Sequence, residues 1–371
     1  MRIIVDIRSL HTKELSGVEY FTTQVLEQLF AIDKDNQYTL YYNAFKKKQF
    51  DQFHFINVVL KQTRIPNRLL NFVFKFFKYP TIESLAGEGR VLLMPNPNMV
   101  VVRSTTKFVL VVHDLSPILM PEMYSLKAQM WHKFINIPKL VKRADKILAV
   151  SDFTKQTLID KLGIEPNKIV SAPLAVDHER FNKNLDIVKL RSVRNRYGLP
   201  GEFILFLGTI EPRKNLGRLI SAFEQLSGNT HLVIGGKLGW KYSEVLRQIE
   251  QSKKRSMIHY INYVSEEDKP YLIKLASVFA WPSLYEGFGL PPLEAAAVGT
   301  PVLTSNVTSL PEVMGESALL VNPYNIEEIT RGLDTLLTQE IVRDKLIKRG
   351  FDRASKFSWD KTAEKLKSLL N

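Results

Sequence analysis

The sequence has 371 residues, too many for one hydrophobic core, so we expect two or three domains. Its composition, 45% hydrophobic and 24% charged, is that of an ordinary globular protein. It contains no cysteine, so disulfide bonds and thiolate metal sites are excluded. Its formal net charge of +13 indicates an affinity for anions but does not distinguish nucleic acid, acidic lipid and phosphorylated substrates. The N-terminal apolar run is too short for a signal peptide, and no apolar stretch reaches the roughly 18 residues that span a membrane. We therefore expect a cytoplasmic protein.

Short β-branched runs alternate with amphipathic helical patterns through both halves of the chain, which predicts parallel sheets built from βαβ units. In the first half, strands are expected at residues 3–7, 38–42, 56–60, 91–93, 108–112 and 146–150, and helices at 18–30, 125–143 and 151–162. In the second half, strands are expected at 203–207, 232–234, 257–261, 278–281, 301–304 and 318–321, and helices at 216–226, 243–251, 266–275, 293–298 and 326–337. The polar stretch 182–201 is a candidate linker, so we predict an α/β protein with two doubly wound domains that meet near residue 190.

Ligands of open α/β sheets bind at the carboxyl ends of the strands, so segments that directly follow predicted strands are the candidate sites. Ser16-Gly17 follows the first strand, where a glycine lets the backbone approach a phosphate; an ordinary tight turn would look the same. His113 follows the strand at 108–112 and is placed to hydrogen-bond a sugar hydroxyl. A buried histidine that is satisfied by the backbone is the alternative.

Two adjacent cations, Arg213 and Lys214, lie between the strand at 203–207 and the helix at 216–226, in a segment that begins at Gly208. Positive charge is disfavoured at the start of a helix, and a bound dianion would reverse that penalty. The arginine fork and the lysine point charge together suit a diphosphate. Asn215 is the expected N-cap of the helix.

A glycine-flanked loop that begins at Glu286 follows the strand at 278–281, and paired prolines then open a helix that includes Glu294. Gly287 and Gly289 allow backbone amides to face a ligand, and the helix N-terminus points to the same place. A diphosphate would repel carboxylates, so we expect the two glutamates to bind neutral hydroxyl groups.

The sequence Glu-Gly-Phe-Gly-Leu-Pro-Pro-Leu-Glu from Glu286 to Glu294 resembles the two-glutamate motif of retaining glycosyltransferase family 4, the glycosyl transferases group 1. The resemblance covers nearly the whole chain and implies the GT-B fold, an α/β architecture of two Rossmann-like doubly wound domains that face each other across a cleft. It implies an N-terminal acceptor-binding domain at 1–185, a C-terminal nucleotide-sugar-binding domain at 186–356 and a helix at 357–371 that crosses back onto the first domain. Weaker motifs occur in the order of the family, at residues 16–17, 113–115, 150–154, 211–215 and 357–359.

The resemblance also implies roles for the matching residues. Arg213 and Lys214 would bind the donor diphosphate, and His113 would contact the transferred sugar. Glu286 would hold sugar hydroxyls. The predicted catalytic residues are therefore His113, Arg213, Lys214 and Glu286. The remaining donor-binding positions would be Gly17, Gly208, Val264, Gly287, Phe288, Gly289, Leu290 and Glu294.

The chain departs from many relatives at two positions. Ser16 stands where a second glycine is common in the first loop, and Thr209 stands where many relatives have an arginine. Arg213 would therefore carry more of the phosphate neutralisation. Residues 211–215 are most similar to mannosyl- and rhamnosyl-transferring members, so GDP-mannose is the first expected donor.

The family retains the anomeric configuration, and cations with a helix N-terminus stabilise the leaving diphosphate without a metal ion. We therefore expect a hexosyltransferase that needs no cofactor and no metal. Asp33-Lys34-Asp35 has the Asp-x-Asp pattern of metal-dependent transferases, but it lies in a polar turn after a helix and is predicted to be solvated.

A basic, aromatic-rich segment lies within residues 41–80, which carry eight basic side chains and one acid. Polar and basic side chains recur there at spacings of three and four, at Lys61, Arg64, Arg68, Asn71, Lys75 and Lys78. From Arg68 onward this pattern predicts an amphipathic helix with a basic stripe and an apolar arc. Such a helix suits an anionic membrane surface, although aromatic rings in the core with solvated cations would give the same pattern. The candidate membrane or acceptor contacts are Arg68, Phe74, Lys75, Phe76, Phe77 and Lys78.

The expected function is transfer of a sugar from a nucleotide-sugar donor to a glycan or lipid-linked acceptor in lipopolysaccharide or exopolysaccharide assembly, at the inner face of the cytoplasmic membrane. A GT-B sugar-nucleotide epimerase would share the scaffold, and a basic nucleic-acid- or membrane-binding protein without catalysis would use the charge alone. A glycoside hydrolase is disfavoured, because its paired carboxylates usually come from different strands. The sequence has no recognised nucleic-acid module, so no nucleic-acid partner is expected.

Overall fold

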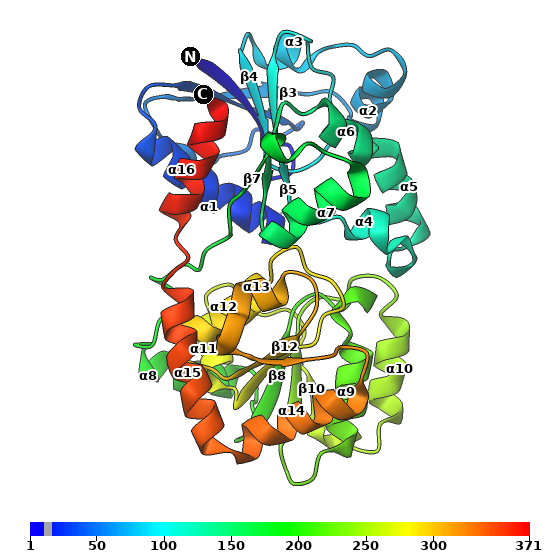
Figure 1. Cartoon of the computed structure of the whole chain (residues 1–371), viewed down its shortest axis with the longest axis vertical. Coiled ribbons are helices and arrows are strands. Elements are labelled where there is room, and N and C mark those ends of the chain that lie inside the picture. The colour runs from blue at the N-terminus through cyan, green and yellow to red at the C-terminus, as the bar shows by residue number, and fades with distance from the viewer. Residues whose placement is uncertain (11–16) are drawn as a thin grey trace. The chain divides into compact units, whose positions relative to one another are not determined.

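The computed structural model describes residues 1–10 and 17–371, which divide into two compact units, each built on a parallel sheet covered by helices (Figure 1). The first unit comprises Met1–Leu115, Met130–Leu174 and Ser358–Asn371, and the second comprises Ser116–Gln129 and Ala175–Phe357. Residues 116–129 and 175–185, which the sequence places in the first domain, therefore group with the second unit.

The first sheet has seven parallel strands in the order β3-β2-β1-β4-β5-β6-β7. They are β1 (Arg2–Asp6), β2 (Gln37–Asn43), β3 (Val58–Thr63), β4 (Val91–Met94), β5 (Lys107–Val112), β6 (Lys146–Ala149) and β7 (Ile169–Ser171). Its central strands are continuous apolar runs buried on both faces, as parallel strands between helices must be. The sequence predicts every strand of this sheet except β7, whose three residues are too few to show a period.

The helices in the first half of the chain are α1 (Gly17–Ile32), α2 (Asn67–Phe76), α3 (Ile82–Ala86), α4 (Ser116–Leu119), α5 (Leu126–Ile135), α6 (Ile137–Arg143) and α7 (Asp152–Leu162). The single helix expected at 125–143 is wrong, because Asn136 adopts a left-handed conformation with φ 58° and ends α5. Its side chain then accepts a hydrogen bond from Lys139 N, and Pro138 occupies the first turn of α6.

The second sheet has six parallel strands in the order β10-β9-β8-β11-β12-β13. They are β8 (Phe203–Leu207), β9 (His231–Gly235), β10 (Ile258–Tyr260), β11 (Val278–Trp281), β12 (Val302–Ser305) and β13 (Leu319–Val321). The chain order reverses between β8 and β11, which pair directly. Their following loops therefore lie side by side at the switch point where open α/β sheets bind ligands.

The remaining helices are α8 (Ile187–Arg196), α9 (Leu216–Gln225), α10 (Ser243–Gln251), α11 (Lys269–Leu275), α12 (Leu290–Ala297), α13 (Leu310–Met314), α14 (Ile326–Thr338), α15 (Glu340–Ala354) and α16 (Trp359–Leu370). The expected linker 182–201 is wrong in its centre, where α8 forms. Asp186 caps α8 by accepting hydrogen bonds from the backbone amides of Val188 and Lys189.

The terminal helix α16 belongs to the first unit and packs against α1 (Figure 1). Trp359 makes edge-to-face contacts with Tyr20 and Phe21, at ring-centroid distances of 6.1 and 5.8 Å. Leu366 and Leu370 are fully buried. The last helix thus completes the core beside α1.

Asp33, expected in a solvated turn, is instead fully buried at the end of α1. Its carboxylate accepts hydrogen bonds from Tyr38 Oη (2.5 Å) and Asn36 Nδ2 (2.7 Å), and Lys367 Nζ of α16 lies 3.4 Å away. Asp35 is exposed. Asp33 therefore has a structural function, which the sequence interpretation missed, whereas Asp35 is solvated as expected.

Candidate active site

The switch point of the second sheet is built on Trp281, the last residue of β11. Its indole stacks on Phe206 at 5.2 Å and is almost fully buried. Gly208, just after β8, lies flat against this ring, because a Cβ at Gly208 would stand 2.5 Å from Trp281 Cη2. Gly236, with φ 137°, meets the same segment, and a Cβ there would stand 1.9 Å from the carbonyl oxygen of Gly208. Glycine at these positions therefore allows the two loops and the ring to pack together.

Arg213 and Lys214 lie in a single 3₁₀ turn, Pro212–Lys214, that leads into α9. Asn215 follows in the left-handed region at φ 60° and is the N-cap residue, as expected, but its side chain does not cap the helix. Its amide instead donates to the carbonyls of Pro282 (2.9 Å) and Pro323 (2.7 Å). The buried amide thus fastens the cation turn to the loop after β11.

Both cations contact Glu286. Lys214 Nζ lies 2.7 Å from Oε1, Arg213 Nη1 lies 3.0 Å from Oε2, and Trp281 Nε1 donates to Oε1 at 3.0 Å. Arg213 Nη2 also lies 2.7 Å from Oε1 of Glu211, a buried acid to which the sequence interpretation gave no function. The structure therefore brings three of the four predicted catalytic residues into one cluster.

The electrostatics of this cluster follow from burial and pairing. Burial opposes ionisation of Glu286, but the charges of Lys214 and Arg213 outweigh it and lower the pKa of the carboxyl to about 2. Burial, and then the charge of Arg213, lower the pKa of Lys214, while Glu286 and Glu211 oppose that shift. Lys214 Nζ also lies 4.6 Å from the centroid of the Trp281 ring.

The chain from Gly287 to Leu290 joins this cluster to α12. Ser309 Oγ lies 2.9 Å from the carbonyl of Glu286 and 2.8 Å from that of Phe288, which fixes the loop. Gly289 has φ 104°, and a Cβ there would stand 2.5 Å from Leu310 Cδ2. The predicted donor-binding positions Gly287, Phe288, Gly289 and Leu290 thus form one fixed turn at the start of α12.

Glu294 lies within α12 and is 2% exposed. Its two carboxylate oxygens lie 2.9 and 2.7 Å from Nζ of Lys269 in α11. Burial raises the pKa of Glu294, and the charge of Lys269 opposes this shift. The sequence interpretation missed Lys269, and no motif marked it. Val264, the predicted nucleobase contact, is buried in the loop after β10.

His113 and Gly17 belong to the first unit. His113 Nε2 donates to the carbonyl of Pro95 at 2.8 Å, and its ring meets Phe21 edge-to-face at 4.9 Å. Burial lowers the pKa of His113, so its imidazole is neutral at pH 7. Gly17 is the first residue of α1 and is exposed. Ser16 lies outside the described residues.

The aromatic side chains of the basic helix, all expected on one exposed face, are divided between the core and the surface. Phe74, expected to face a membrane or an acceptor, is buried with Leu70 and Met99, and its ring lies under the guanidinium of Arg8 at 5.6 Å. Phe76 and Phe77 are 63% and 69% exposed. The exposed apolar face, which we call the α2 patch, consists of Leu69, Phe72, Phe76, Phe77 and Tyr79.

Lys75, one of the predicted contacts, donates to the carbonyl of Phe134 at 3.0 Å, and Arg68 and Lys78 are exposed. Among the described residues, no helix has the length and apolar character to cross a membrane. Likewise, no three acidic or histidine side chains of the described chain are grouped as a metal site.

Comparison with known proteins identifies the family. Residues 15–180 match the model for Glycosyltransferase Family 4, and residues 193–353 match that for Glycosyl transferases group 1. The chain is 33% identical over 269 residues to O-antigen chain mannosyltransferase B of Escherichia coli, covering 71% of this chain and 70% of that protein. It is 34% identical over 263 residues to the serotype-specific mannosyltransferase WbdA of E. coli, but this match spans only 32% of the longer relative.

Solved structures of low sequence identity share the fold. A sucrose-phosphate synthase from Thermosynechococcus elongatus superimposes with a TM-score of 0.76 at 18% identity, covering 99% of this chain and 98% of that one. HepE of Anabaena, solved with UDP and glucose, gives 0.76 at 17% identity, covering 100% and 99%. The expected GT-B fold of two Rossmann-like domains is confirmed. The family matches make the chain a member of glycosyltransferase family 4, and its activity is that of a hexosyltransferase.

Proposed function

We propose that the protein transfers mannose from GDP-mannose to a saccharide acceptor during assembly of a cell-surface polysaccharide, with retention of the anomeric configuration. The relatives carry names of this kind: O-antigen chain mannosyltransferase B, WbdA and, at 27% identity, O-antigen chain mannosyltransferase RfbU of Salmonella typhimurium. The observation that carries the chemistry is the pair of cations, Arg213 and Lys214, held at the switch point of the second sheet.

In the proposed reaction, the bond between the sugar C1 and the β-phosphate oxygen breaks, and a bond from C1 to the acceptor oxygen forms on the same face. The acceptor proton passes to the β-phosphate, so the products are GDP and a glycoside. Arg213 and Lys214 would stabilise the charge that develops on the leaving diphosphate. They need no reorganisation for this, because Glu286, Glu211 and Trp281 hold them in place.

In this proposal Glu286 has two functions, where the sequence predicted only one, the binding of sugar hydroxyls. Both of its oxygens already accept hydrogen bonds from cations or from Trp281. It would therefore position the two cations as well as accept a hydrogen bond from a sugar hydroxyl. Its low pKa keeps it ionised at pH 7, so it does not serve as a general acid.

We also propose that the protein works at the surface of an anionic membrane. The α2 patch places exposed aromatic rings beside Arg68 and Lys78, and Phe72 contacts Phe76 at a ring-centroid distance of 4.7 Å. Aromatic side chains with flanking cations are suited to the boundary between lipid head groups and acyl chains. A lipid-linked acceptor would be reached at that boundary.

The test is to incubate the purified protein with GDP-mannose, UDP-glucose or dTDP-rhamnose, each with and without an α-mannoside acceptor. We expect a new mannoside and GDP only with GDP-mannose and acceptor together, with the same rate in EDTA. A changed sugar from the donor alone would replace the proposal with an epimerase. Transfer from another donor would refute the assignment of GDP-mannose, and a rate abolished by EDTA and restored by a divalent cation would refute metal independence.

A further inference from the structure

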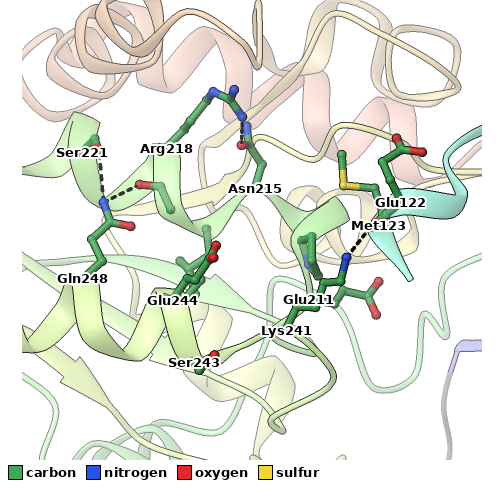
Figure 2. Close-up of a pocket in the computed structure, with 14 residues that line it drawn as sticks. Glu122, Met123, Glu211, Asn215, Arg218, Ser221, Lys241, Ser243, Glu244 and Gln248 are labelled. Atoms are coloured by element: carbon green, nitrogen blue, oxygen red, sulfur yellow. Dashed lines mark hydrogen bonds between the residues drawn. The ribbon is translucent and has the colours of Figure 1, made fainter. Parts of the chain in front are cut away.

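A pocket of about 670 Å³ opens in the second unit beside the cation cluster, between α9, α10 and the turn Pro121–Met123 (Figure 2). This volume lies within the range of about 300–1,000 Å³ that is usual for small-molecule sites. Glu211 belongs to its lining and also lies 2.7 Å from Arg213 Nη2. The pocket therefore shares a wall with the proposed reaction site but extends away from it along α9 and α10.

The outer wall of the pocket is fastened by polar contacts with the loop before α10. Lys241 Nζ donates to the carbonyl of Glu122 at 2.5 Å (Figure 2). Trp240 Nε1 donates to the carbonyl of Met123 at 2.6 Å. The Trp240 indole also stacks on Tyr124 at 5.3 Å with an interplanar angle of 20°. These contacts hold the turn in place, so the pocket exists before any ligand binds.

The floor of the pocket depends on Gly217 in the first turn of α9. Gln248 of α10 donates from Nε2 to the carbonyl of Gly217 and to Ser221 Oγ, both at 3.0 Å. A Cβ at Gly217 would stand 3.1 Å from Gln248 Oε1. A methyl group at Gly217 would therefore press on the side-chain amide of Gln248, which lines the pocket.

The charges around the pocket indicate its ligand. Three carboxylates, on Glu122, Glu211 and Glu244, face two cations, on Arg218 and Lys241. Because Glu211 is already paired with Arg213, the other charges of the lining balance, and the pocket offers no excess positive charge to a nucleotide or another phosphate ester. Hydroxyls, amides and carboxylates together offer both donors and acceptors, and a sugar hydroxyl uses both.

We propose that this pocket binds a neutral saccharide unit of the acceptor glycan, away from the end that reacts. The proposal rests on the proposed function for the identity of the glycan as an acceptor. Growing polysaccharides present several sugars, and a second subsite would favour long acceptors over single sugars. Glu211 would lie at the boundary between this subsite and the cations.

Binding without donor tests the pocket separately from catalysis. Isothermal titration calorimetry would compare α-mannotetraose with methyl α-mannoside, using Ser243→Trp to fill the pocket and Arg247→Trp as the matched control. Both residues are exposed on α10, but only Ser243 lines the pocket. We expect at least tenfold weaker binding of the tetraose to Ser243→Trp, unchanged binding to Arg247→Trp, and unchanged GDP-mannose binding to both.

Gly217→Ala provides a finer test, because alanine favours a helix while its methyl group crowds the floor. We expect severalfold weaker tetraose binding with no loss of thermal stability. Unchanged tetraose affinity in Ser243→Trp would overturn the proposal, and so would absence of tetraose binding to the wild type. If no sugar is transferred from GDP-mannose but Ser243→Trp still abolishes tetraose binding, the donor assignment fails and the pocket stands.

Discussion

At the scale of single residues, the centre of the second unit is an ionic cluster with no formal net charge. Arg213 and Lys214 are matched by Glu211 and Glu286, all with little exposure. Removing one member of a buried pair costs more than the pair contributes, because it leaves an uncompensated charge. In the proposed reaction, the donor diphosphate would meet cations already oriented by acids, which is the condition for electrostatic stabilisation without reorganisation.

Lys214→Ala is expected to lower kcat by about 100-fold or more, as for other preorganised stabilisers of developing charge. The protein should still fold, because Glu286 keeps Arg213 and Trp281 as donors. Initial rates at saturating GDP-mannose measure the effect. Arg247→Ala, which removes an exposed cation of α10 that lies outside the cluster and does not line the pocket, serves as the control. A near-normal rate for Lys214→Ala would remove Lys214 from the catalytic set.

Glu286 should make the stability of the protein depend on pH in the acid range. Its pKa is lowered to about 2 in the folded protein, against about 4.3 in an unfolded chain. Its contribution is therefore present above about pH 4.3 and is lost as the pH falls towards 2, with a total on the order of 3 kcal/mol.

Glu286→Gln removes this dependence. The difference in unfolding free energy between wild type and variant should be largest near pH 7 and should shrink between about pH 4.5 and 2. Urea denaturation at a series of pH values measures it. A difference that stays constant across this range would show that Glu286 titrates in the folded protein as it does in the unfolded chain.

The centre of this cluster could be predicted from the sequence, because its residues directly follow predicted strands. Arg213, Lys214 and Glu286 follow two strands that the topology makes neighbours. Lys269 could not be found in the same way, because its pairing with Glu294 depends on how α11 packs against α12. The burial of Phe74 could not be predicted either, because helical spacing shows which residues share a face but not whether that face packs against other residues.

At the scale of elements, α2 has two apolar faces with different functions. Leu70 and Phe74 face the interior of the first unit, where Met99 and partly buried apolar side chains pack against them. Phe76 and Phe77 face outwards. Spacing alone merges these residues into one arc, so the sequence could predict the helix but not its division.

Phe74→Ala and Phe77→Ala form a matched pair that separates the two faces. We expect Phe74→Ala to lower the free energy of unfolding by about 3–5 kcal/mol, because it opens a cavity in the core. Phe77→Ala should change it by less than about 0.5 kcal/mol, because its ring is 69% exposed. Urea denaturation measures both. Equal losses would show that Phe77 is packed in solution.

The predicted limits of helices were wrong where the backbone conformation of single residues, rather than hydrophobic periodicity, sets the end of a helix. The helical pattern continues through residues 125–143, but Asn136 takes a left-handed conformation and divides it. The stretch 182–201 resembles a linker because it is polar overall, and α8 buries only Val193 while Ile187 and Val188 are exposed. Strong strands such as β8 and β11 were found with their observed limits, because continuous apolar runs mark them.

At the scale of the whole molecule, the net charge of +13 and the α2 patch predict salt-sensitive membrane binding. The protein should bind vesicles that contain anionic lipid and should dissociate as salt is raised from 0.1 to 1 M, because the Debye length falls from about 10 to about 3 Å. Replacing Phe76 and Phe77 with Ser should weaken binding at least tenfold without loss of stability. Vesicle cosedimentation measures this, and equal binding to neutral vesicles would contradict it.

The position of α16 has a consequence for how the protein is made. Trp359, Leu366 and Leu370 complete the core beside α1, yet they are synthesised after every residue of the second unit. While the ribosome is still translating, the face of α1 that they cover has no partner from its own chain. Domains usually fold in order from the N-terminus during synthesis. Here the second unit can close before α16 has been synthesised, so part of the first unit's core stays uncovered until this helix arrives.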